Sequence, residues 1–260
     1  MAKNVNTPPE LRIAALEQQK QLEAITNLMT PGDGTPWEQR GSGGVVGGFF
    51  KTAIQSMLNP SKLLWSIRRP ETTADATGFL LLCGAFWGIG WVVHDFLYKL
   101  WSVEPRVNSI EFTGHYDESI YFLGMMLAAL LCPLWAILAV KFQIPLFRKL
   151  LAMEFERTRT KPDVTLFYNV LAYLQGPAVL SILPVVGPPL AVGWIFVNTS
   201  VAMIKRMRTT VAGSIIAVIL TGLATIAVAV GVGVVLDFLW YQLPTGGAIQ
   251  KNPWGDNNYQ

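Results

Sequence analysis

The chain is poor in charge, in cysteine and in histidine, and each shortage argues against a class of function. Only 14% of its 260 residues are charged, whereas soluble domains carry about 25%. The two cysteines, Cys83 and Cys132, both lie in apolar stretches, so neither a disulfide framework nor a zinc site is expected. The only histidines are His94 and His115, and the sequence has no Walker loop, H-E-x-x-H or G-x-S-x-G motif. The sequence therefore predicts a protein that is not an enzyme and binds no cofactor or metal.

Apolar residues take the place of the missing charge. Hydrophobic residues make up 52% of the chain, and the mean hydropathy is +0.39. A helix needs about 20 apolar residues to cross the hydrocarbon core of a bilayer. Five stretches approach or exceed that length: about 76–96, 120–140, 164–183, 188–204 and 211–241. The predicted fold class is all-α, a polytopic transmembrane helical bundle of five spans. The fifth stretch is longer than a crossing requires, so it is expected to tilt, to project from the bilayer or to break. If it breaks, Gly231-Val-Gly233 is the expected place.

The basic residues lie almost entirely on alternate sides of these spans. Segments 1–75, 141–163 and 205–208 hold eight, six and three of them, and the intervening segments hold only Lys99, Arg106 and Lys251. Lys and Arg are enriched in cytoplasmic loops. We therefore expect the N-terminus in the cytoplasm and the C-terminus outside, in an integral multi-pass membrane protein. Because basic residues flank spans instead of forming one patch, no nucleic-acid partner is expected.

The connection between the third and fourth stretches is rich in proline. The hairpin 175–189 carries no charge and contains Pro177, Pro184, Gly187, Pro188 and Pro189. Proline ends or kinks helices, so neither helix continues through it. One interpretation is two full spans joined by a tight outer turn. The alternative is a re-entrant pair, which we expect to leave four spans and to place the C-terminus inside. The uninterrupted length of the fifth stretch favours the first.

The chain before the first span divides into two parts. Residues 1–48 are predicted to be a cytoplasmic extension with a helix at 9–29 and a Gly/Pro-rich linker at 30–48. The helix has an apolar stripe formed by Leu11, Ala15, Leu22, Ile25 and Met29. That stripe favours docking on a partner, on a second copy or on the bundle; the alternative is a fraying polar extension.

Residues 49–75 are predicted to be amphipathic segments in the lipid headgroup layer, because basic residues and Trp65 accompany an apolar face. In the first segment, Phe49, Phe50, Ala53, Ile54, Met57 and Leu58 are expected on one face, and Lys51, Gln55 and Ser56 on the other. Core helices of a soluble domain are the alternative. The five-span membrane domain then covers 76–241, and 242–260 form an outer polar tail.

Polar residues near and within the spans suggest sites of two kinds. His94 and Asp95 end the first span and Asp237 lies near the end of the fifth, so they would form an ion or proton site if those helices were neighbours; ordinary interfacial helix ends are the other interpretation. The amides Asn169, Gln175 and Asn198 lie inside the third and fourth stretches. They are expected to join helices by hydrogen bonds, and the alternative is that they line a polar pathway.

A seam of small residues follows one face of the fifth stretch at every fourth position. It comprises Gly213, Ala217, Thr221, Thr225, Ala229 and Gly233. Gly84 and Gly88 form a shorter seam on the first span. Small residues let two helix backbones approach closely. We expect these two faces to pack together within one molecule; the alternative is an oligomer or a foreign subunit on the same seam.

The region from Phe167 to Leu220 resembles a known family. Ala172-Tyr173 is followed by Pro177, by Leu183-Pro184-Val185-Val186-Gly187 and by a span with Trp194. Asn59-Pro60 with Leu63, Trp65 and Ile67 is similar to the segment that opens bacterial members. These features resemble the Yip domain family (Ypt-interacting-protein-like five-span membrane proteins), over about residues 57–240.

The chain also departs from that family. It lacks the Asp-Leu-Tyr-Gly-Pro motif of eukaryotic members, and Pro188 and Pro189 are atypical. The resemblance implies a bacterial-type member with the five-span fold and topology, located in the bacterial inner (plasma) membrane. It implies no catalytic residue.

Two functional hypotheses follow. The leading one is a non-enzymatic integral membrane scaffold or adaptor, or an accessory subunit of a larger membrane complex. Its partners would be the lipid bilayer and other membrane proteins, bound through residues 9–29 and the span seams. The alternative is a small transporter or channel component that uses the proline-broken hairpin 175–189. Transport ranks second because only one broken element occurs and no internal repeat is visible.

Overall fold

The computed structural model describes residues 33–40, 44–68, 72–101, 118–158 and 163–242, with side chains except at 98–101, 118–125 and 236–242. Its regular elements over these residues are all helical. In chain order they are α2 (Gly44–Leu58), α3 (Pro60–Ser66), α4 (Ala74–Trp101), α5 (Glu118–Leu150), α6 (Ala152–Arg157), α7 (Val164–Tyr173), the 3-10 helix η1 (Gly176–Ile182), α8 (Gly187–Lys205) and α9 (Val211–Gln242).

Four helices are long and apolar enough to cross a membrane: α4, α5, α8 and α9. The chain is therefore a multi-pass membrane protein. The stretch predicted as a third span is not one helix, because α7 ends at Tyr173 and η1 begins at Gly176 with Pro177 in its first turn. In contrast, α9 continues without interruption through Gly231 and Gly233, so the predicted break is wrong.

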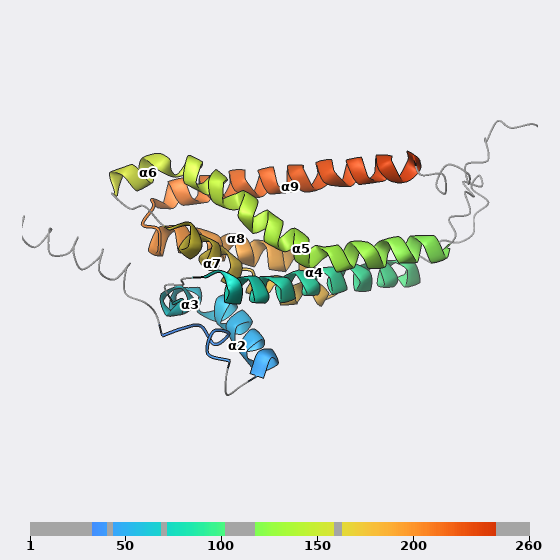
Figure 1. Ribbon diagram of the computed structural model, residues 1–260, viewed down its shortest axis with the longest axis horizontal. Helices are drawn as coiled ribbons and strands as arrows, with labels where there is room; N and C mark the ends of the chain where they lie inside the picture. Colours follow the sequence, from blue (N-terminus) through green and yellow to red (C-terminus); the bar gives the residue numbers. More distant parts are fainter. Residues whose placement is uncertain (1–32, 41–43, 69–71, 102–117, 159–162, 243–260) are drawn as a thin grey trace, which may run out of the picture.

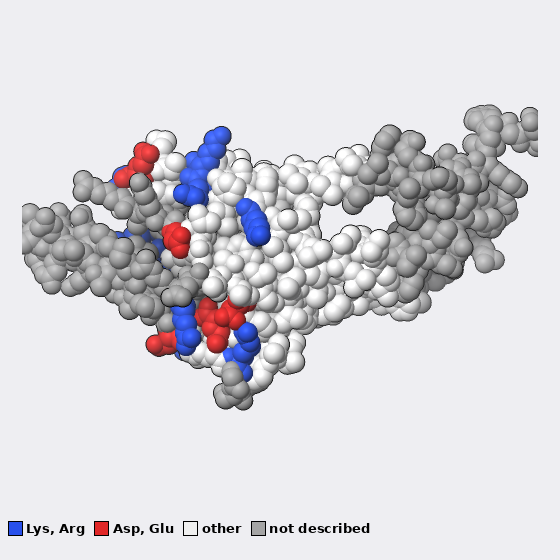
Figure 2. Space-filling model, in the orientation of Figure 1, with Lys and Arg blue, Asp and Glu red and all other residues white. Residues whose placement is uncertain are grey.

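The long helices α4, α5, α8 and α9 run roughly along the long axis of the molecule, and α4 and α9 begin at the same end (Figure 1). Lys, Arg, Asp and Glu side chains gather at that end on the face shown in Figure 2; we call it the charged end, and the opposite end the outer end. Helix α7 starts at the charged end and α8 returns to it. A hairpin that leaves and re-enters one side cannot change the side on which α9 starts. The expectation that a re-entrant pair would reverse the C-terminus is therefore wrong.

Helices α4 and α5 form a close antiparallel pair. An added Cβ at Gly84 would lie 2.5 Å from the Cα of Pro133, and one at Gly88 would overlap the carbonyl oxygen of Ala129. Only glycine permits backbones to approach this closely. The prediction that Gly84 and Gly88 pack on the seam of the fifth span is therefore wrong, because α5 occupies that position.

Helix α5 contains two prolines, Pro133 and Pro145, and it crosses from α4 at the outer end to α9 at the charged end (Figure 1). Proline removes one backbone hydrogen bond and bends a helix. The outer half of α5 therefore accompanies α4, and its inner half accompanies α9.

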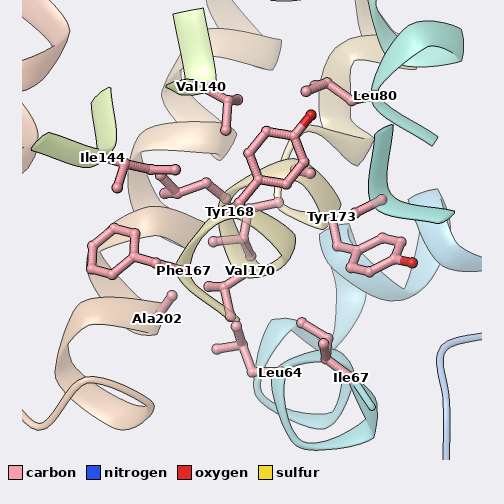
Figure 3. Packing of buried hydrophobic residues seen from close by; sticks show 14 of the residues in the cluster. Leu64, Ile67, Leu80, Val140, Ile144, Phe167, Tyr168, Val170, Tyr173 and Ala202 are labelled. Atoms are coloured by element: carbon pink, nitrogen blue, oxygen red, sulfur yellow. The ribbon is translucent and has the colours of Figure 1, made fainter. Parts of the chain in front are cut away.

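The hydrophobic core lies in the half of the molecule near the charged end. Helix α7 is buried from Phe167 to Tyr173, and Figure 3 shows its side chains among Leu64, Leu80, Val140 and Ala202 from four other helices. Because α7 is enclosed by protein, its apolar residues add to a protein core instead of facing lipid.

Residues 33–40, expected to belong to a flexible linker, are instead packed on the bundle. Trp37 is buried; its indole Nε1 donates to the Asp75 carbonyl (2.6 Å) and its backbone N–H donates to Thr52 Oγ1 (2.8 Å). Arg40 pairs with the Asp75 carboxylate at 2.8 Å. The Tyr173 hydroxyl donates to Glu38 (3.0 Å). The segment thus closes the charged end of the core.

Helix α2 starts at Gly44, within the expected linker, and its apolar residues point two ways. Phe49 and Ala53 are buried in the bundle, whereas Phe50, Ile54 and Leu58 are exposed. Ser56, predicted on the polar face, is fully buried. The predicted single apolar face is therefore wrong, because one side of α2 contacts protein and another apolar side is free.

Candidate functional site

The tip of the α7–α8 hairpin is fastened to α4. At Gly90 an added Cβ would lie 2.6 Å from the carbonyl oxygen of Ser181, so η1 and α4 touch backbone to backbone. His94 Nε2 lies 3.2 Å from the same carbonyl, and the Val185 N–H donates to His94 Nδ1 at 3.4 Å. Because a backbone N–H can only donate, Nδ1 is the acceptor and Nε2 carries the proton. Neutral His94 therefore joins both sides of the hairpin tip to α4.

The hairpin residues singled out in the sequence shape this tip. Pro177 is buried in η1, Pro184 lies in the turn, and Gly187, Pro188 and Pro189 open α8. An added Cβ at Gly187 would collide with the carbonyl oxygen of Leu180. Val185 has φ of 62°, an unfavourable conformation for a β-branched residue. The turn is thus tight and strained.

The other side of the hairpin completes the C-terminal end of α2. The last carbonyl groups of a helix lack intrahelical partners, and such groups are costly away from water. Asn198 Nδ2 donates to the Ser56 carbonyl (2.9 Å), and Trp194 Nε1 donates to the Met57 carbonyl (3.0 Å). Asn198 therefore joins two helices in this structure.

The other two amides singled out in the sequence lie in the hairpin as well. Asn169 is buried in α7, and its Oδ1 has no hydrogen-bond partner. Gln175 caps the start of η1 through its backbone. All three amides thus lie in the larger α7–α8 hairpin, which consists of α7, η1 and α8. Of the three, Asn198 makes the interhelical bond described above.

The three ionisable residues proposed as an ion site do not come together. His94 and Asp95 lie on α4, and Asp237 lies near the end of α9, where α9 stands apart from α4 (Figure 1). The predicted cluster is therefore wrong, because the divergence of the two helices separates its members. Over the described ranges, no group of three His, Cys, Asp or Glu side chains could hold a metal ion.

The seam of α9 is used in its first half and free in its second. Ala217 and Thr221 are buried, Gly213 lies 3.3 Å (measured from an added Cβ) from Glu154, and the hydroxyl of Thr225 accepts a hydrogen bond from Gln143 of α5 (3.3 Å). Beyond Thr225 the seam continues as Ala229, half-buried, and Gly233, exposed. An added Cβ at Gly233 would meet nothing within 4 Å.

The outer half of α9 stands free of the rest of the described protein. Both α5 and α9 are less buried than α4, with 11% and 17% of their apolar windows buried against 39%. Figure 2 shows a gap between α9 and the α4–α5 pair toward the outer end. The side chains exposed along this half are apolar: Ile226, Val228, Val230, Val232, Val234 and Val235.

The residues of the predicted partner helix, Leu11, Ala15, Leu22, Ile25 and Met29, lie outside the described residues. Comparison with known proteins adds no relative: no family model, no curated protein and no solved structure matches the chain.

Sequence reasoning missed two features. The first is the Glu38–Tyr173 contact, which belongs to a segment whose composition is that of a linker. The second is Arg206, which is fully buried and has the Trp65 ring 4.9 Å from its guanidinium carbon. Burial lowers the pKa of Arg206. From the sequence, Lys205, Arg206 and Arg208 are only the basic residues of segment 205–208, which predict the orientation in the membrane.

Proposed function

We propose that this protein is a non-enzymatic scaffold or accessory subunit of a larger membrane complex, and that the outer half of α9 receives a transmembrane helix of a partner. One observation carries the proposal. The seam of small residues extends two turns past Thr225, which is hydrogen-bonded to Gln143, toward the gap of Figure 2.

The chemistry of the seam favours a helix over lipid as the occupant. Small residues at every fourth position allow backbones to approach, and van der Waals packing then drives association in a bilayer. The first half of the same seam already packs inside the molecule, where Ala217 and Thr221 are buried. Ala229 and Gly233 offer the same surface without an occupant, so a partner helix would extend an existing mode of packing.

We propose for the topology a cytoplasmic charged end and an outer C-terminus, in the inner membrane of a bacterium. The charge distribution in the sequence supports this orientation. Helix α7 and η1 together span about 29 Å at 1.5 and 2.0 Å per residue, which supports counting them as a fifth, broken crossing. Kinship to the Yip domain family stays a proposal based on the hairpin residues.

The proposal is tested by exchanging matched residues on opposite sides of α9. Ala229→Ile fills the seam, whereas Ala227→Ile adds the same bulk about 200° away around the helix. After gentle detergent extraction, native mass spectrometry is expected to show a complex with other membrane proteins for the wild type and for Ala227→Ile. Ala229→Ile is expected to leave the chain alone. Equal complexes for both variants would contradict the proposal.

We also propose that the 9–29 segment contributes to partner binding on the cytoplasmic side. Deletion of residues 1–29 is then expected to weaken the complex while the bundle keeps its thermal stability. An unchanged set of partners after the deletion would show that this segment does not bind them.

The alternative function is transport through the hairpin. One observation favours it: the amide oxygens of Asn169 and Asn198 are buried and have no hydrogen-bond partner, so they offer acceptors to a passing polar solute. In a flux assay with the purified protein in liposomes, Asn169→Leu would then abolish uptake. A chain that reconstitutes as a folded monomer with no uptake of any tested solute would exclude this alternative.

A further inference from the structure

Arg206 is the largest fully buried side chain in the described part of the protein. It follows α8 directly at the charged end, and its backbone N–H closes that helix on the Ala202 carbonyl (2.8 Å). Its side chain reaches Trp65 of α3. Neither Nε nor Nη1 of the guanidinium has a hydrogen-bond partner.

A buried guanidinium with unused donors is costly. A charge that is taken out of water without a partner destabilises the folded protein. The contact with Trp65 offsets part of this penalty, but it uses none of the donors, because these lie in the guanidinium plane and not on its face. Arg206 therefore needs an anion that accepts hydrogen bonds.

The protein itself does not supply that anion in the described ranges. The ion pairs there join Arg40 to Asp75 and Arg157 to Glu154. Glu154, which reaches the same connection between α8 and α9, is bound by Thr210 and Arg157. The C-terminal dipole of α8 favours a cation, but it supplies no acceptor for the unused guanidinium donors. No described carboxylate therefore neutralises Arg206, and an anion from outside the described part of the protein can occupy this position.

The two chain segments that hold Trp65 and Arg206 are rich in basic residues. Lys205 Nζ donates to Ser61 Oγ (3.0 Å), which joins the end of α8 to the start of α3. Segments 59–68 and 205–210 together contain Lys62, Arg68, Lys205, Arg206 and Arg208 and no acidic residue. A net positive site of this kind attracts a phosphate oxyanion.

The location of the site points to a lipid as the source of the phosphate. Trp65 covers Arg206 and is itself 42% exposed, as expected of a tryptophan at a membrane interface. The neighbouring helix α2 presents Val46, Phe50, Ile54 and Leu58 on an exposed stripe at four-residue spacing. An apolar stripe beside a basic cluster is the pattern by which interfacial helices lie on anionic membranes.

We propose that Arg206, under Trp65 and beside Lys205, binds the phosphate group of an anionic phospholipid at the charged end of the bundle. Basic recesses between membrane helices recognise lipid headgroups in this way. The Trp65 side chain forms the outer wall of the site and moves aside to admit the phosphate. The inference does not depend on the scaffold role, because it uses no residue of the α9 seam.

The test is lipid retention by the full-length protein. The wild type, Arg206→Gln and Arg148→Gln are exchanged into nanodiscs of equal phosphatidylglycerol and phosphatidylcholine, and the lipids kept after detergent release are counted by native mass spectrometry. Arg148→Gln is the matched control, because Arg148 lies at the same end on α5 and is exposed. We expect the wild type and Arg148→Gln to keep phosphatidylglycerol selectively, and Arg206→Gln to lose about tenfold in that selectivity.

Three outcomes would overturn the inference. They are equal retention of the two lipids by the wild type, equal selectivity in Arg206→Gln, and an equal loss in Arg148→Gln. Inorganic phosphate separates the two sources of the anion: if it raises the melting temperature of the detergent-purified wild type as much as short-chain phosphatidylglycerol does, the site binds free phosphate and not lipid. If Arg206→Gln does not fold, the melting temperature of the wild type is compared in the two lipids. A higher melting temperature with phosphatidylglycerol than with phosphatidylcholine supports the inference, and equal melting temperatures overturn it.

Discussion

The half of the molecule near the charged end and the half near the outer end are built differently. Near the charged end, α7 is buried from Phe167 to Tyr173 among side chains of α3, α4, α5 and α8. Toward the outer end, α9 diverges from the bundle, and most of the side chains that it exposes are valines. The first half has a core like that of a soluble protein, whereas the second relies on lipid or on another protein.

The two halves differ in what surrounds their apolar residues, which is protein in one half and lipid or another protein in the other. In a bilayer, apolar side chains gain nothing from leaving lipid, so only close packing and hydrogen bonds hold helices together. Near the charged end the helices have both, through Gly176, Asn198 and Trp194. The outer half of α9 has neither within the described protein. The account therefore predicts strong mutational effects in one half and weak ones in the other.

The largest effect is expected where the same substitution is made in the two halves. Gly84→Val places a branched side chain against the backbone of Pro133, 2.5 Å from an added Cβ, and should cost about 3 kcal/mol or more. Gly231→Val meets nothing within 4 Å and should change stability by less than about 0.5 kcal/mol. Thermal unfolding in detergent measures both. Similar melting temperatures for the two variants would contradict the claim that the two halves differ in packing.

A smaller loss is expected at the junction of α8 with α2. Asn198→Leu leaves the Ser56 carbonyl without its donor, which should destabilise the protein by about 1–3 kcal/mol. Val197→Leu, at the exposed neighbouring position, is the control and should be neutral. If Asn198→Leu is as stable as the control, the amide does not hold the two helices together.

Two substitutions at the hairpin tip should change the stability of the protein in opposite directions. His94→Ala removes both bonds from α4 to the tip and should cost about 1 kcal/mol. Val185→Gly relieves a φ of 62°, worth about 1–2 kcal/mol, less the entropy cost of glycine; the net gain should be about 0.5 kcal/mol. Denaturant or thermal midpoints distinguish the signs. A loss of stability in Val185→Gly would show that its side chain matters more than its strain.

The smallest expected effect is a gain in helix stability within the free half of α9. Gly233→Ala replaces a poor helix former by a good one in open space, so stability should rise by less than about 1 kcal/mol. A clear destabilisation would show that a second helix already lies against this face in the isolated protein.

Much of the fold was predictable because hydropathy is a direct signal for helices in lipid. The stretches that became α4, α8 and α9 were located to within a few residues, and α5 continues some ten residues beyond its predicted end. The break in α9 was wrong because Gly231 and Gly233 sit in a helix whose backbone bonds have no competing partner in lipid, so two glycines do not interrupt it. The break between α7 and η1 is where the Gly-Pro pair Gly176-Pro177 lies.

Tertiary pairings were beyond the sequence. Two small-residue seams are present, but nothing in their spacing says that Gly84 and Gly88 meet Pro133 and Ala129 instead of α9. The cluster of His94, Asp95 and Asp237 failed for the same reason, because equal depth does not imply adjacency. Trp37 was the one available signal that residues 33–40 are packed, since a tryptophan in a Gly/Pro-rich segment calls for a surface to cover.

The most direct test of the central claim is photo-crosslinking in native membranes, with a photoreactive amino acid placed at position 229 or at position 227. The account predicts one discrete protein adduct from position 229, on the seam, and only lipid adducts from position 227, on the opposite side of α9. The same adducts from both positions, or lipid alone from both, would contradict the claim that the outer half of α9 is a docking face for a partner helix.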